Sequence, residues 1–206
     1  NGGNLTYSGA GKIHTITGLL KASGSASTKT LLTVDAGTEL KVGTLDNAWG
    51  INLDVDGTIT VSGSLKQAFN NSGLSIGGEG SVTAGSLDVS NQSRFEVGVN
   101  TLNVTGGFNM SGAQSKVTFK SGTTTIAGAT NITTNSTAAD TINQVIFEDG
   151  NAVLTGAVSN GAVIKVNSGS VTMNGGISGT GKLELANGSL TLGGSGNSVG
   201  TFEYSG

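Results

Sequence analysis

The stretch Lys116–Thr130, KVTFKSGTTTIAGAT, contains the pattern that decides the fold. Two apolar residues, Val117 and Phe119, alternate with polar residues before a glycine turn, and a second alternating run ends at Ile126. Strict alternation of apolar and polar residues predicts β-strands that bury one face. The stretch therefore predicts two short strands joined by a tight turn.

The same pattern recurs along the chain. The turn residues are Gly37, Gly57, Gly80, Asn100, Gly122, Gly150, Gly169 and Gly188, with Gly11 as a weaker first member. Neighbouring turn residues are 19 to 28 positions apart, 19 from Gly169 to Gly188 and 28 from Gly122 to Gly150. A second glycine closes each repeat, at Gly43, Gly63, Gly85, Gly106, Gly128, Gly156, Gly175 and Gly194.

Apolar residues occupy fixed places in each repeat. The pairs before the turns are Leu32/Val34, Leu53/Val55, Leu74/Ile76, Phe95/Val97, Val117/Phe119, Val145/Phe147, Ile164/Val166 and Leu183/Leu185. The pairs after the turns are Leu40/Val42, Ile59/Val61, Val82/Ala84, Leu102/Val104, Thr124/Ile126, Ala152/Leu154, Val171/Met173 and Leu190/Leu192. A further apolar residue usually follows the second glycine, as at Leu45, Leu65, Leu87, Phe108, Val158 and Ile177. We expect all of these side chains to point inward.

A repeat of about 20 residues built from short strands predicts a parallel β-solenoid, because a propeller blade needs about 40. We expect an all-β fold, a single-stranded parallel β-helix of about nine coils of 19–28 residues, with residues 1–206 forming one segment. Glycine is expected at the corners because the backbone there takes a positive φ.

Two parts of the chain depart from the regular repeat. In the opening coil, Leu5 and Tyr7 precede the turn, and Ile13 and Ile16 are expected as the apolar pair after it. The segment 129–143, ATNITTNSTAADTIN, is the longest break in the alternation. We expect it to be a loop that protrudes from the rod.

The composition excludes several classes of function. The chain has 10 Lys and Arg against 13 Asp and Glu, a net charge of −3, which does not resemble a nucleic-acid-binding protein. Cysteine and proline are absent, and no run approaches the roughly 18 apolar residues of a membrane-spanning helix. The absence of cysteine fits a protein that acts outside the cell.

The last coil, Gly179–Gly194, reads GTGKLELANGSLTLGG and combines a glycine-rich turn, paired Leu-x-Leu strands and an Asn-Gly-Ser corner. This combination resembles the repeat of Gram-negative autotransporter passenger domains. The resemblance implies a right-handed parallel β-helix from a protein secreted to, or displayed on, the bacterial cell surface. It also implies that the chain is a fragment of a longer passenger, translocated across the outer membrane by a barrel outside this sequence.

Few residues are candidates for catalysis or metal binding. His14 is the sole histidine, and a strand position without a catalytic role is the simpler reading. Asp54 and Asp56 lie on one side of a strand, where paired carboxylates could bind Ca²⁺ or hydrolyse a glycoside, but neither full motif is present. A solvated outward face is the better explanation for them, as it is for Glu148 and Asp149. We therefore predict no catalytic residue, metal or cofactor.

The aromatic residues outside the inward series are Trp49, Phe69, Tyr7 and Tyr204. An exposed tryptophan could stack on a sugar or on a partner protein. Covering a corner of the core is the alternative use of such a residue.

The outward residues predict two different sides of the rod. The outward residues before the turns include Asp35, Asp54, Asp56, Glu96, Lys120, Glu148, Lys165 and Glu184, which predicts a charged and mostly acidic side. After the turns they are mostly hydroxyls and amides: Thr58, Thr60, Ser81, Thr83, Thr101, Asn103, Thr123, Thr125, Ser170, Thr172, Ser189 and Thr191. If the coils stack in register, these twelve residues form two columns almost free of charge, a candidate contact face.

Three interpretations of these columns remain open. Ser and Thr suit exposed strands, and the columns could serve solubility alone. An uncharged hydrogen-bonding side could instead meet a second copy, a cell-surface glycan or a host protein with little desolvation of charge. An ice-binding face is a third option, suggested by the Thr-x-Thr spacing.

The sequence therefore favours a structural and adhesive segment that mediates cell adhesion, self-association or biofilm formation through an extended lateral face. A carbohydrate-active β-helix, either a polysaccharide lyase or hydrolase or a tailspike-like protein, is the alternative. That class needs charged residues gathered in a groove with aromatic platforms, whereas Arg94 is the one arginine and aromatics are 4% of the chain.

Overall fold

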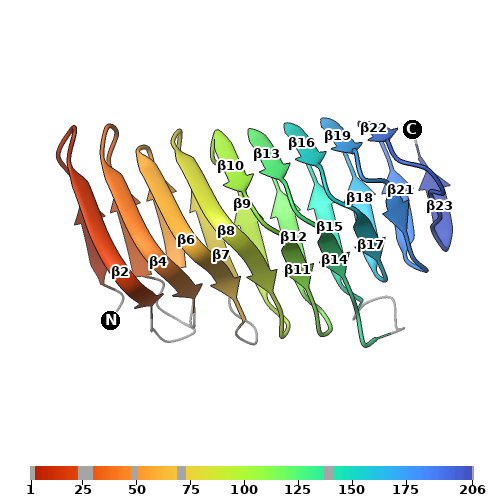
Figure 1. Cartoon of the computed structure of the whole chain (residues 1–206), viewed down its shortest axis with the longest axis horizontal. Coiled ribbons are helices and arrows are strands. Elements are labelled where there is room, and N and C mark those ends of the chain that lie inside the picture. The colour runs from red at the N-terminus through yellow and green to blue at the C-terminus, as the bar shows by residue number, and fades with distance from the viewer. Residues whose placement is uncertain (1–2, 23–29, 48–50, 69–72, 137–141, 206) are drawn as a thin grey trace.

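The computed structural model describes residues 3–22, 30–47, 51–68, 73–136 and 142–205. These residues form a rod of parallel β-strands, a β-solenoid of about eight turns, with the chain ends at opposite ends of the rod (Figure 1). Its described part contains no helix, and so none that could cross a membrane. The predicted parallel β-helix is confirmed.

One side of the solenoid, which we call sheet A, has ten strands. They are β1 (Asn4–Tyr7), β3 (Thr30–Val34), β5 (Ile51–Val55), β7 (Gly73–Gly77), β9 (Arg94–Val97), β12 (Lys116–Phe119), β15 (Gln144–Phe147), β18 (Val163–Val166), β21 (Lys182–Leu185) and β23 (Thr201–Tyr204). Each strand pairs in parallel with the corresponding strand of the next coil, so equivalent residues of successive coils become neighbours.

The opposite side, sheet B, has thirteen strands. They are β2 (Ile13–Ala22), β4 (Glu39–Asn47), β6 (Thr58–Gln67), β8 (Ser81–Val89), β10 (Thr101–Val104), β11 (Phe108–Met110), β13 (Thr123–Ile126), β14 (Thr130–Ile132), β16 (Asn151–Leu154), β17 (Val158–Asn160), β19 (Ser170–Met173), β20 (Ile177–Ser178) and β22 (Ser189–Leu192). The first four are long strands, and β8 pairs with both β10 and β11. From β10 to β20, the long strand of each coil is replaced by two short ones.

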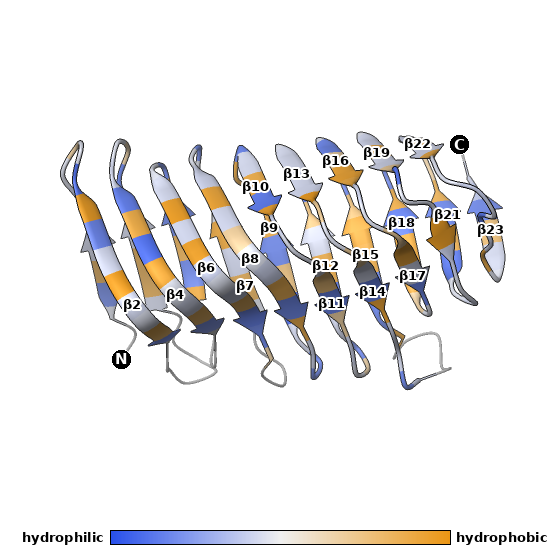
Figure 2. Cartoon of the chain, viewed as in Figure 1, coloured by the Kyte–Doolittle hydropathy of each residue, from blue (hydrophilic) through white to orange (hydrophobic). Residues whose placement is uncertain are grey.

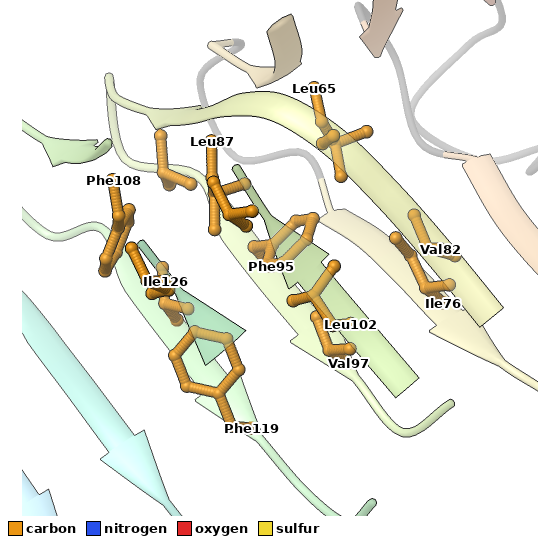
Figure 3. Close-up of a cluster of buried hydrophobic side chains, with 14 of the residues drawn as sticks. Leu65, Ile76, Val82, Leu87, Phe95, Val97, Leu102, Phe108, Phe119 and Ile126 are labelled. Carbon is orange, nitrogen blue, oxygen red and sulfur yellow. The ribbon is translucent and has the colours of Figure 1, made fainter. Parts of the chain in front are cut away.

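The core lies between the two sheets and consists of the predicted apolar pairs. Every member of these pairs from Leu32 to Leu183 is buried, and so are the six residues predicted after the second glycines. The close-up shows them interdigitating across the interior (Figure 3), and the bands of alternating hydropathy run along each strand (Figure 2). The ring of Phe119 stacks on Phe147 at 5.0 Å and meets the edge of Phe108 at 6.4 Å. The last coil is less covered, with Leu192 39% exposed.

The prediction for the first coil was wrong by one residue. Ile13 is 59% exposed and lies beside Glu39, an outward residue of the next coil. His14 instead pairs in register with Leu40, and Ile16 with Val42. The core positions of this coil therefore belong to His14 and Ile16. With strict period-two geometry, residues 13 and 16 could not share a face.

The second glycine of each repeat is required by close backbone approach, and not by the positive φ that we expected. A Cβ added at Gly128 would lie 2.6 Å from the carbonyl carbon of Gly106, and one at Gly156 would lie 2.5 Å from that of Gly128. Of this series, only Gly194 has a positive φ, 65°. The glycines thus stack directly on one another at the bend of sheet B.

Several turn glycines do meet the original expectation. Gly122, Gly150 and Gly169 have φ of 75°, 80° and 74°. They also stack closely, since a Cβ at Gly150 would lie 2.2 Å from the carbonyl oxygen of Gly122. The positive φ and the lack of room for a Cβ therefore both require glycine at this corner.

Part of the predicted loop 129–143 is regular, buried structure. Thr130–Ile132 forms strand β14, which pairs with β11 and β17 and buries Thr130 and Ile132. At the far end, Asn143 is fully buried, accepts a hydrogen bond from the Ser115 N–H at 2.8 Å and donates to the Thr133 carbonyl at 2.6 Å. The neighbouring coils thus supply the pairing that the weak local pattern did not predict. Residues 137–141 lie outside the described residues.

Replacement of Gly128 by alanine tests the glycine stack. We expect Gly128→Ala to lower the free energy of unfolding by about 1–3 kcal/mol or more, because the new methyl group would overlap the backbone of the preceding coil. Gly77→Ala is the control, since nothing lies within 4 Å of a Cβ there, and it should be neutral or stabilising by about 0.4–1 kcal/mol. Chemical denaturation measures both, and equal losses would contradict the stack.

A second prediction concerns a polar atom in the core. The Thr130 hydroxyl oxygen is buried without a hydrogen-bond partner. We expect Thr130→Val to raise the free energy of unfolding by about 1 kcal/mol, because valine has nearly the same shape and removes the unsatisfied group. Thr125→Val on the outer surface should change it by less than about 0.5 kcal/mol. Destabilisation by Thr130→Val would show that the hydroxyl is satisfied.

Candidate functional site

The two predicted columns of hydroxyls and amides lie on the outer surface of sheet B in continuous register. The Thr58 column contains Thr58, Ser81, Thr101, Thr123, Asn151, Ser170 and Ser189, each paired with the next. The Thr60 column contains Thr60, Thr83, Asn103, Thr125, Val153, Thr172 and Thr191 in the same way. All twelve predicted residues are therefore brought together into two parallel rows.

The geometry of the strands sets the spacing of these rows. Neighbours within a column are about 4.8 Å apart along the rod, and the two columns are about 6.6 Å apart, two residues along a strand. Thr101, Thr123, Ser189 and Thr191 are exposed, and the other predicted members are half-buried by their neighbours. The result is a regular grid of polar groups supported by a rigid core.

A third column, which we did not predict, lies on the same sheet beyond the glycine bend. This Asp88 column contains Asp46, Lys66, Asp88, Asn109, Asn131, Ser159 and Ser178. Side-chain amides link its middle, since Asn109 donates to Asp88 at 3.1 Å and Asn131 donates to Asn109 at 3.2 Å. The only sequence signal was a polar residue directly between two apolar ones in a very short run, as with Asn109 between Phe108 and Met110.

Asp88 is the best-satisfied carboxylate of sheet B. Its side chain accepts hydrogen bonds from the hydroxyls of Ser64 and Ser86 and from the amide of Asn109. Partial burial opposes ionisation, but these hydrogen bonds and the charge of Lys66 outweigh it and lower the pKa of Asp88. Asp88 is therefore held ionised as part of the structure.

Charge is confined to one end of the outer surface of sheet B. Glu39, Lys41, Asp46, Lys66 and Asp88 lie on β4, β6 and β8, where Lys41 pairs with Glu39 at 3.3 Å. From β10 to β22 the outward residues are Thr101, Asn103, Asn109, Thr123, Thr125, Asn131, Asn151, Val153, Ser159, Ser170, Thr172, Ser178, Ser189 and Thr191. None of these is charged, and we call this surface the uncharged face.

The outer surface of sheet A is charged along its length, but it is not mostly acidic as predicted. Arg94, Lys116 and Lys182 also point outward there, between buried neighbours. Ion pairs join successive coils, with Lys120 and Glu96 at 2.8 Å and Lys165 and Glu184 at 2.7 Å. The prediction counted the residues nearest the turns and missed the basic residues at the strand starts.

These ion pairs perturb the pKa values of their members. The hydrogen bond to Glu96 raises the pKa of Lys120. Partial burial opposes ionisation of Glu184, but Lys165 and Lys182 outweigh it and lower its pKa. Exposed ion pairs of this kind stabilise a protein by about 0–1 kcal/mol each. Their main effect here is that each side chain neutralises the charge of the other.

The candidate catalytic residues do not converge on a site. His14 lies at the end of the core beside Tyr7, with ring centroids 5.1 Å apart. Asp56 accepts the Glu79 N–H at 3.1 Å and Asp149 accepts the Gly150 N–H at 2.8 Å, so both carboxylates stabilise turns. Asp54 is exposed. Across the described ranges, no three His, Asp or Glu side chains gather in a way that could hold a metal ion.

The hollows of the surface are shallow and contain few groups that could bind or activate a substrate. One of about 360 Å³ lies between Lys66, Asp88 and Asn109, and one of about 190 Å³ lies beside Arg94 and Glu96. Each contains a single carboxylate and no aromatic ring. Tyr7 is half-buried at one end of the rod and Tyr204 is 68% exposed at the other. Trp49 and Phe69 lie outside the described residues.

Comparison with known proteins gave no match: no protein family, no curated protein and no solved structure is significantly similar to this chain.

The pKa of Asp88 predicts how the protein responds to acid. Because the pKa is lowered in the folded state, the stabilisation is present above the ordinary aspartate range and is lost as the pH falls through the folded-state pKa. We expect Asp88→Asn to lose less stability than the parent when denaturation midpoints are compared between neutral pH and about pH 3. Identical profiles for Asp88→Asn and the parent would contradict the assignment.

Proposed function

We propose that this chain is a structural and adhesive segment of a bacterial passenger protein of the autotransporter type, secreted or displayed at the cell surface. The resemblance of Gly179–Gly194 to passenger repeats supports this, as do the β-solenoid fold and the lack of cysteine. In this role the rod presents an extended lateral surface to its partner.

The observation that carries the proposal is the register of the Thr58 and Thr60 columns on sheet B. A partner that meets these rows can form many hydrogen bonds while desolvating almost no charge, which is the costly part of burying a polar surface. The rows are long, and they are repeated coil by coil. Such a surface suits adhesion over an area better than recognition of a small molecule in a pocket.

The carbohydrate-active alternative has no observation in its favour. Glycoside hydrolysis needs two carboxylates about 5–10 Å apart across the substrate. The hollows beside Asp88 and Glu96 each offer one carboxylate and no aromatic platform. Incubation with a panel of polysaccharides would reverse this ranking if any saccharide were released.

Charge placed in the columns tests the proposal. We expect Thr60→Lys, Thr125→Lys and Thr172→Lys together to weaken aggregation or adhesion of cells that display the chain, because three charges would have to be desolvated. Three charge substitutions on the outer surface of sheet A, at Glu96, Lys120 and Lys165, should have less effect. Circular dichroism and surface expression control for folding. If the triple variant adheres like the parent, the columns serve solubility only.

A further inference from the structure

The uncharged face of sheet B has a composition that can match itself. Its hydroxyls and side-chain amides both donate and accept hydrogen bonds, so two identical faces can satisfy each other. The one apolar member of the Thr58 and Thr60 columns, Val153, lies on β16, the middle strand of the series β10, β13, β16, β19 and β22. A partly exposed apolar residue at the centre with polar residues around it is the arrangement of a protein interface.

We infer that the uncharged face binds a second copy of this chain, face to face and antiparallel, about a two-fold axis that runs along β16. The inference rests on the proposed adhesive function and names its partner. Symmetric pairing of one patch with itself is the commonest form of self-association. A neutral glycan or an unrelated protein on this face is an outcome that the tests below distinguish.

The antiparallel direction follows from where the charges lie. If two copies were parallel, the charged coils β4 to β8 of one copy would face the charged coils of the other, and the contact would desolvate Glu39, Lys41 and Asp46 of both copies, which is unfavourable. In the antiparallel arrangement, the uncharged strands β10 to β22 of one copy face those of the other, and the charged coils β4 to β8 lie outside this contact.

The symmetry fixes which residues meet. Rotation about β16 preserves each column and exchanges β13 with β19, so Thr125 faces the partner's Thr172. Val153 faces the partner's Val153 on the axis, and Asn151 faces the partner's Asn151, where two side-chain amides can exchange hydrogen bonds. Every pair formed in this way is uncharged.

The size of the face fits a weak but specific contact. Five coils at about 4.8 Å give a length of about 24 Å, and the three columns span about 20–30 Å across the strands. The contact then buries roughly 500–700 Å² on each copy, or 1,000–1,400 Å² in total, the lower end of the range for specific interfaces. Single rods would associate weakly, and many rods on two cell surfaces would hold together by avidity.

The first test measures association of the purified chain by sedimentation equilibrium and small-angle scattering. We expect reversible dimers, and Thr125→Lys with Thr172→Lys should raise the concentration at half-association at least about tenfold, because each lysine meets a lysine of the partner. The matched control carries Thr15→Lys and Ser62→Lys, two exposed positions of sheet B outside the uncharged face. It should associate like the parent.

The second test separates the two directions of pairing. In the antiparallel dimer, a chain with Thr125→Lys and Thr172→Asp places each lysine opposite the partner's aspartate, so it should associate at least as well as the parent. In a parallel dimer each coil faces the same coil of the partner, so with the two-fold axis along the Thr60 column the same chain would place lysine against lysine and aspartate against aspartate. Loss of association by this variant, with the control intact, overturns the antiparallel arrangement.

The outcomes also separate this inference from the proposed function. If the parent chain stays monomeric up to millimolar concentration, the inference that a second copy is the partner is overturned. If cells displaying that chain still adhere to another surface, and the triple lysine variant abolishes the adhesion, the adhesive function stands with a different partner. If neither association nor adhesion depends on the uncharged face, both proposals fail.

Discussion

Parallel in-register pairing of successive coils is the constraint on which the rest of this structure depends. Because each strand pairs with its equivalent one coil later, whatever residue type occupies a position is repeated at about 4.8 Å along the rod. Inside, this repetition gives a continuous apolar core, as at Phe119 and Phe147. On the outer surface, any favourable or unfavourable interaction of a residue is repeated in every coil.

The glycine stack follows directly from this constraint. Where sheet B bends, the backbones of neighbouring coils come too close for a Cβ, as the 2.4 Å between Gly156 and a methyl group added at Gly175 shows. A larger residue would separate two coils at that point and weaken the pairing on both sides of it. The bend can therefore be repeated along the rod only if each coil has a glycine there. The residue is required for space, which is why its φ is unremarkable at most of these positions.

The sequence predicted the parts of the fold that repeat and failed where a single coil departs from the repeat. The apolar pairs and the Thr58 and Thr60 columns were predicted correctly because alternation and spacing reinforce each other over many coils. Ile13 was misplaced because it and Ile16 are three residues apart, so the apolar pattern of this coil does not follow the period of two that places His14 and Ile16 on one face. Strand β14 was missed because three residues, Thr130–Ile132, carry too little pattern, and its pairing with β11 and β17 supplies the stabilisation. The Asp88 column was missed for the same reason.

The two outer surfaces differ in how they avoid repulsion between equivalent residues of successive coils. On sheet A, a column of one charge would repel itself from coil to coil, and the structure offsets this with cross-coil pairs such as Lys165 with Glu184. On sheet B, the same problem appears only up to Asp88, where Lys66 and the neighbouring hydroxyls stabilise the carboxylate. Beyond it, the chain uses neutral groups, among them the amide ladder of Asn109 and Asn131. Neutral residues are not needed for stability there, because sheet A carries paired charges over the same coils. An uncharged surface that coil stacking does not require, facing away from a charged one, is the feature on which the proposed contact with a partner rests.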